Sequence, residues 1–97
     1  MNARKDFFSL REVFKKVFKE MGIEDKIISL KIRDVWVELM GKPIEKHTRK
    51  IVLKNKVVSV YLNSSVLKQE LSFLEKKVIK GLNEKLEGEY IEKIRFL

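Results

Sequence analysis

Apolar residues near the N-terminus recur with the period of an α-helix. Between Leu10 and Met21 they follow one another every three or four residues, and lysines occupy the other side. Ser9 followed by Glu12 has the spacing of a capping box, in which a serine begins a helix and a glutamate three residues later bonds back to it. Gly22 supplies a stop signal. The pattern predicts an amphipathic helix within residues 1–22 that begins at the capping box.

A second helical pattern follows directly. Glu24 and Asp25 place carboxylates where the positive end of a helix dipole favours them. Gly41 ends the pattern, and Pro43 stands two residues later, where a helix cannot continue. The apolar stripe of this predicted helix consists of Ile28, Ile32, Val35, Trp36 and Leu39.

From His47 onward the period changes to the alternation typical of strands. Two alternating segments flank Lys54-Asn55-Lys56, an arrangement that predicts a β-hairpin. The apolar positions of the two predicted strands are Ile51 and Leu53 in the first, and Val58, Val60 and Leu62 in the second.

The last third of the chain predicts one long helix and one short strand. Asn63-Ser64-Ser65 has the composition of a helix N-cap, and Gly88 closes the helical pattern. Residues 90–97 form the strand, with Ile94 and Phe96 on one face. The apolar stripe of the helix is Leu67, Leu71, Leu74, Val78, Leu82 and Leu86.

The predicted order is therefore α-α-β-β-α-β. A three-stranded sheet exposes an apolar face unless helices cover it, so we predict a small α+β fold with the sheet packed against helices. Ninety-seven residues suffice for one domain, residues 1–97. Within it the helix in residues 1–22 is joined by a short connection to a core of residues 24–97, so this helix can dock on its own domain or on a neighbour's.

Composition limits the classes of protein. There is no cysteine, so neither a disulfide framework nor a thiolate metal site is expected. The basic N-terminus lacks the continuous apolar segment of a signal peptide, and no run approaches the roughly 18 apolar residues of a membrane span. We expect a soluble cytoplasmic protein that does not enter a membrane.

The charge is strongly positive and unevenly distributed. Lys and Arg number 22 against 14 Asp and Glu, which leaves +8 and a pI near 9.8. Such an excess favours polyanionic partners, nucleic acid first, although small lysine-rich proteins are also basic merely to stay soluble. Glu45 is the only acid in the segment that carries most of the excess, whose cations are Lys42, Lys46, Arg49, Lys50, Lys54 and Lys56.

Candidate catalytic groups are few. His47 is the only histidine, and Ser64 and Ser65 stand where helix caps stand. Because no nucleophile with a base, no metal-ligand set and no glycine-rich phosphate loop is present, we predict a protein that is not an enzyme and needs no metal or cofactor. Trp36 lies on the stripe of the second helix, where it is either a core residue or an exposed partner contact.

Dispersed positions from Trp36 to the C-terminus resemble the DciA-type domain, a bacterial family whose members include operators or loaders of the replicative DNA helicase. The resemblance implies a KH-like domain, α-β-β-α-β, that binds DNA and the replicative helicase and works at the nucleoid. The Gly-x-x-Gly clamp of true KH domains is absent here. The matching positions are Trp36, Gly41, His47-Thr48, Val58-x-Val60, Asn63-Ser64-Ser65, Gln69-Glu70-Leu71, Leu82-Asn83, Gly88 and Ile94-Arg95.

The first functional hypothesis is a non-enzymatic nucleic-acid-binding module that serves helicase recruitment. Without the glycine clamp, affinity should come mainly from Lys and Arg at phosphates, and Tyr61 is a candidate for stacking on a base. DNA and RNA, single-stranded or duplex, stay open. An RNA-binding or ribosome-associated factor fits the same charge. The predicted contacts are Lys42, Lys46, Arg49, Lys50, Lys54, Lys56 and Tyr61.

The second hypothesis is a protein-interaction module. The aromatic residues of the first helix would then form a surface for the helicase or for a second copy in a homodimer. The alternative is that these side chains are core. The candidate partner-binding residues are Phe7, Phe8, Phe14, Phe18 and Trp36.

Overall fold

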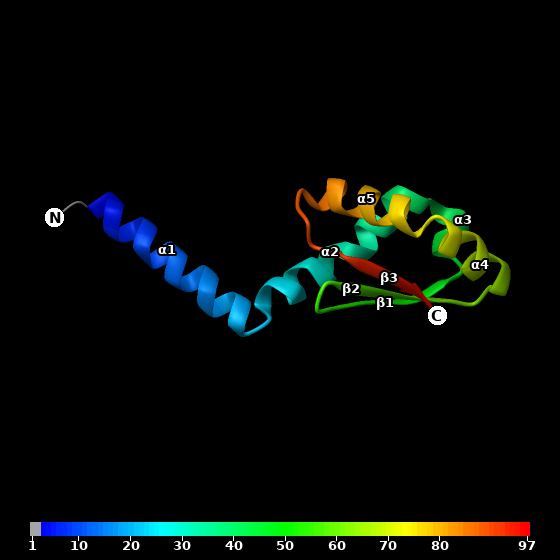
Figure 1. Cartoon of the computed structure of the whole chain (residues 1–97), viewed down its shortest axis with the longest axis horizontal. Helices are drawn as coiled ribbons and strands as arrows, with labels where there is room; N and C mark the ends of the chain where they lie inside the picture. The colour runs from blue at the N-terminus through cyan, green and yellow to red at the C-terminus, as the bar shows by residue number, and fades with distance from the viewer. Residues whose placement is uncertain (1–2) are drawn as a thin grey trace.

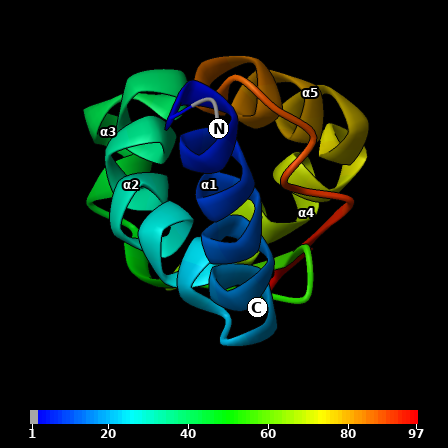
Figure 2. The same cartoon turned by 90° about the vertical axis from the view of Figure 1, so that its left-hand side faces the viewer.

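The structure, a computed structural model, describes the backbone of residues 3–97 and the side chains of residues 9–97. A three-stranded sheet lies under a layer of helices, and the first helix projects from this body (Figures 1 and 2). The elements are α1 (Ala3–Glu20), α2 (Ile23–Met40), α3 (Lys42–Glu45), β1 (Thr48–Lys54), β2 (Val57–Leu62), α4 (Ser65–Phe73), α5 (Glu75–Leu86) and β3 (Lys93–Phe96).

The sheet has the order β1-β2-β3, so β2 is central. β1 and β2 form the predicted antiparallel hairpin, whose turn residues Asn55 and Lys56 have φ of 50° and 64°. Two consecutive residues with positive φ match the turn twist that hairpin strands need. β3 runs parallel to β2, because α4 and α5 return the chain to the end of the sheet where β2 began. The α+β fold with a three-stranded sheet is confirmed.

β1 contains a bulge at Arg49. Thr48 pairs with Leu62, but the next partner of the hairpin, Tyr61, faces Lys50, so Arg49 is the extra residue. Beyond the bulge the alternation is regular, with Leu53 buried between exposed or half-buried neighbours. The bulge therefore sets which residues of β1 face the helices and which face away.

The predicted start of the first helix is wrong. α1 begins at Ala3, and Ser9 lies inside it rather than at its N-cap. Residues 3–8 contain neither glycine nor proline, so nothing in the local sequence ends the helix before Ser9. The predicted end is correct, because Gly22 follows the helix with φ of 72°.

The long helix expected after the hairpin is in fact two helices. Ser64 caps α4 as predicted and accepts a 3.3 Å bond from the Leu67 backbone N–H. The helical path breaks at Leu74, whose φ of −104° lies outside the helical range, so Leu74 leaves the buried stripe and is exposed. Glu87, at φ of 59°, is the left-handed residue that ends α5, and Gly88 follows it.

A short helix, α3, follows the end of α2 and contains Pro43. Pro43 occupies the first turn of α3, a position at which its missing N–H costs nothing. The corner that follows is held by a buried polar chain: Trp36 Nε1 donates to Thr48 Oγ1 at 3.1 Å, and Thr48 Oγ1 donates to the Ile44 carbonyl at 2.8 Å. These bonds fix α2, α3 and the start of β1 against one another.

The core lies between the inner face of the sheet and the helices α2 and α5. Trp36 is its largest member, with 1% of its surface exposed, and its ring lies 6.2 Å from that of Phe96. Asn83 is buried as well, and its side-chain amide exchanges two 2.9 Å hydrogen bonds with the backbone of Ile91. This pair holds the segment before β3 against α5, which places β3 beside β2.

Helix α1 contributes little to this core. All side chains from residue 9 to residue 20 are exposed, and in Figure 1 the helix extends away from the body of the molecule. The structure includes no helix, among the residues described, that is both long and apolar enough to cross a membrane.

We therefore expect deletion of residues 1–21 to leave a folded protein, because the side chains described within it, those of residues 9–21, are exposed and Gly22 is retained before α2. Thermal unfolding followed by circular dichroism should show a cooperative transition close to that of the full chain. A truncated protein without a cooperative transition would show that α1 is part of the folding unit, and would refute the predicted division at residue 22.

Candidate nucleic-acid interface

One face of the sheet is covered by helices and the other is not (Figures 1 and 2). Leu53, Val58 and Ile94 point into the core, so their neighbours along each strand point the opposite way. We call this second surface the outer sheet face. Its residues are Lys50, Val52 and Lys54 of β1, Val57, Ser59 and Tyr61 of β2, and Lys93 and Arg95 of β3.

Strand register arranges these residues in rows across the sheet. In one row Val57 lies between Lys54 and Lys93. In the next, Ser59 lies beside Arg95. The cations occupy the two edge strands and the neutral residues occupy the centre, so the face has two basic margins whose backbones lie about 10 Å apart, given the usual strand spacing.

Tyr61 stands on the central strand directly opposite Lys50. The Lys50 Nζ atom lies 5.7 Å from the centre of the Tyr61 ring, within the range of a cation–π interaction. The Tyr61 residue is 38% exposed. Proteins that bind single-stranded nucleic acids combine exposed aromatic rings, which stack on bases, with cations, which contact phosphates.

No acid weakens the charge of the strands themselves. β1, β2 and β3 contain Arg49, Lys50, Lys54, Lys93 and Arg95 and neither aspartate nor glutamate. The strands therefore carry a net positive charge, which favours contact with phosphates.

The predicted contact residues are brought together only in part. Lys50, Lys54 and Tyr61 share the outer sheet face. Lys56 lies at the hairpin turn, where its Nζ is 3.5 Å from a Glu92 carboxylate oxygen. Arg49 is the bulge residue.

The remaining two predicted contacts, Lys42 and Lys46, belong to α3 and its C-terminal end. Seven residues of β1, about 23 Å at 3.3 Å per residue, separate Lys46 from the hairpin turn. The residues of the basic segment are thus close in sequence, but only Lys50 and Lys54 lie on the outer sheet face.

Sequence reasoning missed Lys93 and Arg95. The signal was present, since Ile94 and Phe96 were assigned to one face of a strand and their neighbours must point to the other. These cations lie far along the chain from the basic segment. Only the parallel pairing of β3 with β2 brings them to the same surface.

The family model described as "Dna[CI] antecedent, DciA" matches residues 9–96. The chain belongs to the DciA family. No curated protein and no solved structure matches the chain significantly.

The DciA match begins well before Trp36, where the sequence resemblance began, and it includes most of α1. Phe14 and Phe18 of this helix are exposed, and their rings stack with centroids 6.1 Å apart. Phe7 and Phe8 lie outside the residues whose side chains are described. Trp36 is buried, so its prediction as a partner contact is wrong: a side chain enclosed by the core has no surface to offer.

In this member of the DciA family, His47 contacts Asn63 through both its side chain and its backbone. Its Nδ1 lies 2.8 Å from Asn63 Oδ1, and the Asn63 backbone N–H donates to the His47 carbonyl at 2.9 Å. These contacts join the residue before β1 to the residue after β2, and so close the open end of the hairpin. Among the described residues no group of three or more potential side-chain ligands is placed to hold a metal ion.

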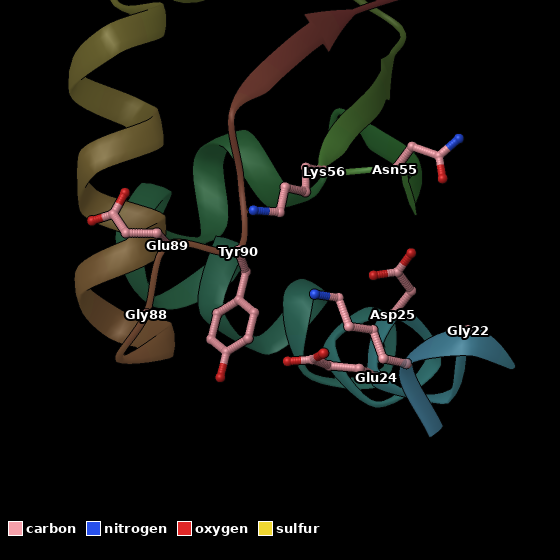
Figure 3. Close-up of a pocket in the computed structure, with 9 residues that line it drawn as sticks. Gly22, Glu24, Asp25, Asn55, Lys56, Gly88, Glu89 and Tyr90 are labelled. Carbon is pink, nitrogen blue, oxygen red and sulfur yellow. The ribbon is translucent and has the colours of Figure 1, made fainter. Parts of the chain in front are cut away.

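A cavity of about 460 Å³ lies where the α1–α2 turn, the hairpin turn and the connection before β3 approach one another (Figure 3). Its charged lining is mixed: Lys19 and Lys56 are offset by Glu24, Asp25 and Glu89. Because the carboxylates would repel phosphate, this cavity is a weaker candidate than the outer sheet face for binding nucleic acid.

Proposed function

We propose that this chain is a non-enzymatic nucleic-acid-binding module of the DciA family that helps to recruit the replicative helicase to DNA. The observation that carries the proposal is the outer sheet face, with Tyr61 on its central strand and cations on both edge strands. Membership of the DciA family supports the link to helicase loading. It also supports a cytoplasmic location at the bacterial nucleoid.

We further propose that the module is KH-like. The order from α2 through β1, β2, α4 and α5 to β3 supports this, because it follows the implied α-β-β-α-β sequence with one helix divided. The glycine clamp of KH domains is absent, so we assign nucleic-acid contact to the outer sheet face instead.

Single-stranded DNA is the form that this face fits best. A single strand exposes the faces of its bases, and an aromatic ring such as Tyr61 can stack on any base. A duplex hides these faces within its stack and presents phosphates instead, against which Tyr61 would contribute little. Cations at phosphates carry no sequence information, so binding should be strong at low salt and largely independent of sequence.

Replacing Tyr61 by alanine should weaken binding to a single-stranded oligonucleotide by about 10-fold, because stacking one base contributes roughly 1–3 kcal/mol. Tyr61→Phe keeps the aromatic face and should retain most of the affinity. Fluorescence anisotropy with a labelled oligothymidylate measures both. Equal losses in the two variants would show that the hydroxyl and not the ring makes the contact.

The proposal as a whole is tested with the purified full chain, a labelled single strand, and the duplex and RNA of the same sequence. We expect the DNA single strand to bind more tightly than the duplex, and the chain to increase the amount of replicative helicase loaded on that strand. Failure to bind any of these at about 50 mM salt would refute the nucleic-acid proposal. Preference for RNA would favour the ribosome-associated alternative.

A further inference from the structure

Helix α1 and the first half of α2 leave large apolar side chains in water. Phe14, Phe18 and Met21 of α1 and its turn are 55%, 44% and 65% exposed. On α2, Ile27 and Leu30 are 47% and 82% exposed. Several large apolar side chains exposed on two adjacent helices indicate an interaction site.

The two helices form a groove at this surface, about 680 Å³ in volume, which we call the α1–α2 groove. The apolar residues of its lining, which we call its floor, include Phe18, Ile23 and Ile27. Tyr90, from the segment before β3, lines one end, and Figure 3 shows its ring beside the start of α2. The charged residues of its rim are Lys15, Lys16, Lys19 and Lys31, against Glu12 and Glu24.

We propose that the α1–α2 groove docks an amphipathic helix of a partner protein whose apolar stripe is flanked by aspartate or glutamate. An apolar floor between two helices accepts the apolar side of a third helix, which is a common mode of peptide recognition. The excess of lysines over glutamates on the rim selects the charge of the partner's flanks. This proposal does not rest on nucleic-acid binding.

Charge also argues against a second copy of this chain as the occupant. The described part of α1 carries Arg11, Lys15, Lys16 and Lys19 against Glu12 and Glu20. Two copies of this helix would therefore bring surfaces of the same net sign together, which is unfavourable at close range.

The groove and the outer sheet face have no residue in common. In Figure 1 α1 extends beyond the end of the sheet. A partner helix bound in the groove therefore leaves the outer sheet face free, and the two surfaces can be occupied at once.

The test titrates the full chain with a designed helical peptide of about five turns that has leucines on one face and glutamates on its flanks. A matched peptide replaces each glutamate by lysine. We expect the glutamate peptide to bind at least about 10-fold more tightly at low salt. Replacing Lys15, Lys16 and Lys19 by glutamine should remove most of this preference.

A second pair of variants tests the apolar floor. Phe18→Gln combined with Ile27→Gln should weaken binding of the glutamate peptide by about 10-fold or more, the loss expected when interface anchors are removed. Phe73→Gln is the matched control, because Phe73 is 78% exposed on α4 and does not line the groove. Melting temperatures should be unchanged in every variant. If the Phe18 and Ile27 variant fails to fold, the variant at Lys15, Lys16 and Lys19 still tests the proposal.

Four results would overturn the proposal. Equal binding of the two peptides would show that the lysines do not select the charge of the partner. A loss of peptide binding in the Phe73 variant equal to that in the Phe18 and Ile27 variant would show that the peptide does not bind in the groove. A sedimentation experiment in which the chain is a dimer that Phe18→Gln dissociates would show that a second copy fills the groove. Loss of oligonucleotide binding in the lysine variant would show that the rim binds phosphates.

Discussion

Replacing Lys50, Lys54 and Lys93 by glutamine is expected to weaken binding of single-stranded DNA on the order of 1,000-fold at about 50 mM salt. These residues lie on both margins of the outer sheet face. A contact with a phosphate is a charge-assisted hydrogen bond, and each contributes about 1.5 kcal/mol or more. A variant that contacts three fewer phosphates also displaces fewer counterions from the DNA when it binds. The slope of log affinity against log salt concentration should therefore become shallower by about 2.

The matched control replaces Lys76, Lys77 and Lys80 of α5, which removes the same charge from another element. Binding isotherms at several salt concentrations compare the two triple variants. Both should fold normally, since exposed lysines contribute little to stability. Equal losses in the two variants would mean that net charge alone drives binding, and a greater loss from the α5 variant would place the interface on the helices.

Trp36→Ala is expected to lower the free energy of unfolding by about 4 kcal/mol, the usual cost of truncating a large buried aromatic side chain. It also leaves Thr48 without its donor from the Trp36 Nε1 atom. A chain of this size has a total stability of roughly 5–15 kcal/mol, so a substantial part of it would be lost. Urea unfolding followed by circular dichroism measures the change.

Trp36→Phe is the control that separates packing from hydrogen bonding. It keeps most of the apolar contact, including the neighbouring ring of Phe96, and loses the bond to Thr48. We expect a cost of about 1–2 kcal/mol. A Trp36→Ala protein of unchanged stability would contradict the burial of this residue and restore it as a surface contact.

Local sequence determined the kinds of element and much of their order. The hairpin followed from alternation on either side of Asn55, because a strand with one buried face must alternate. The end of α1 shortly before Gly22 and the cap at Ser64 followed from backbone and side-chain preferences that act within one turn. The break at Leu74 carries no such signal, since it interrupts a stripe that continues through Val78.

The sequence shows the charge of the basic segment but not which of its residues share a surface. Its charge was visible in the sequence, and Lys50, Lys54 and Tyr61 share one face of the sheet because they lie on paired strands. Its outer members, Lys42 and Lys46, belong to α3 and its C-terminal end, so nearness in sequence did not place them on the same face of the sheet.

Tertiary structure decided the rest. Trp36 could be core or contact until the packing of α2 on the sheet enclosed it. Lys93 and Arg95 joined the outer sheet face only through the parallel pairing of β3 with β2. That pairing depends on the return path through α4 and α5 and on the buried bonds between Asn83 and Ile91. Contacts of this kind join residues distant in sequence, and periodicity within one element contains no information about which other element will lie beside it.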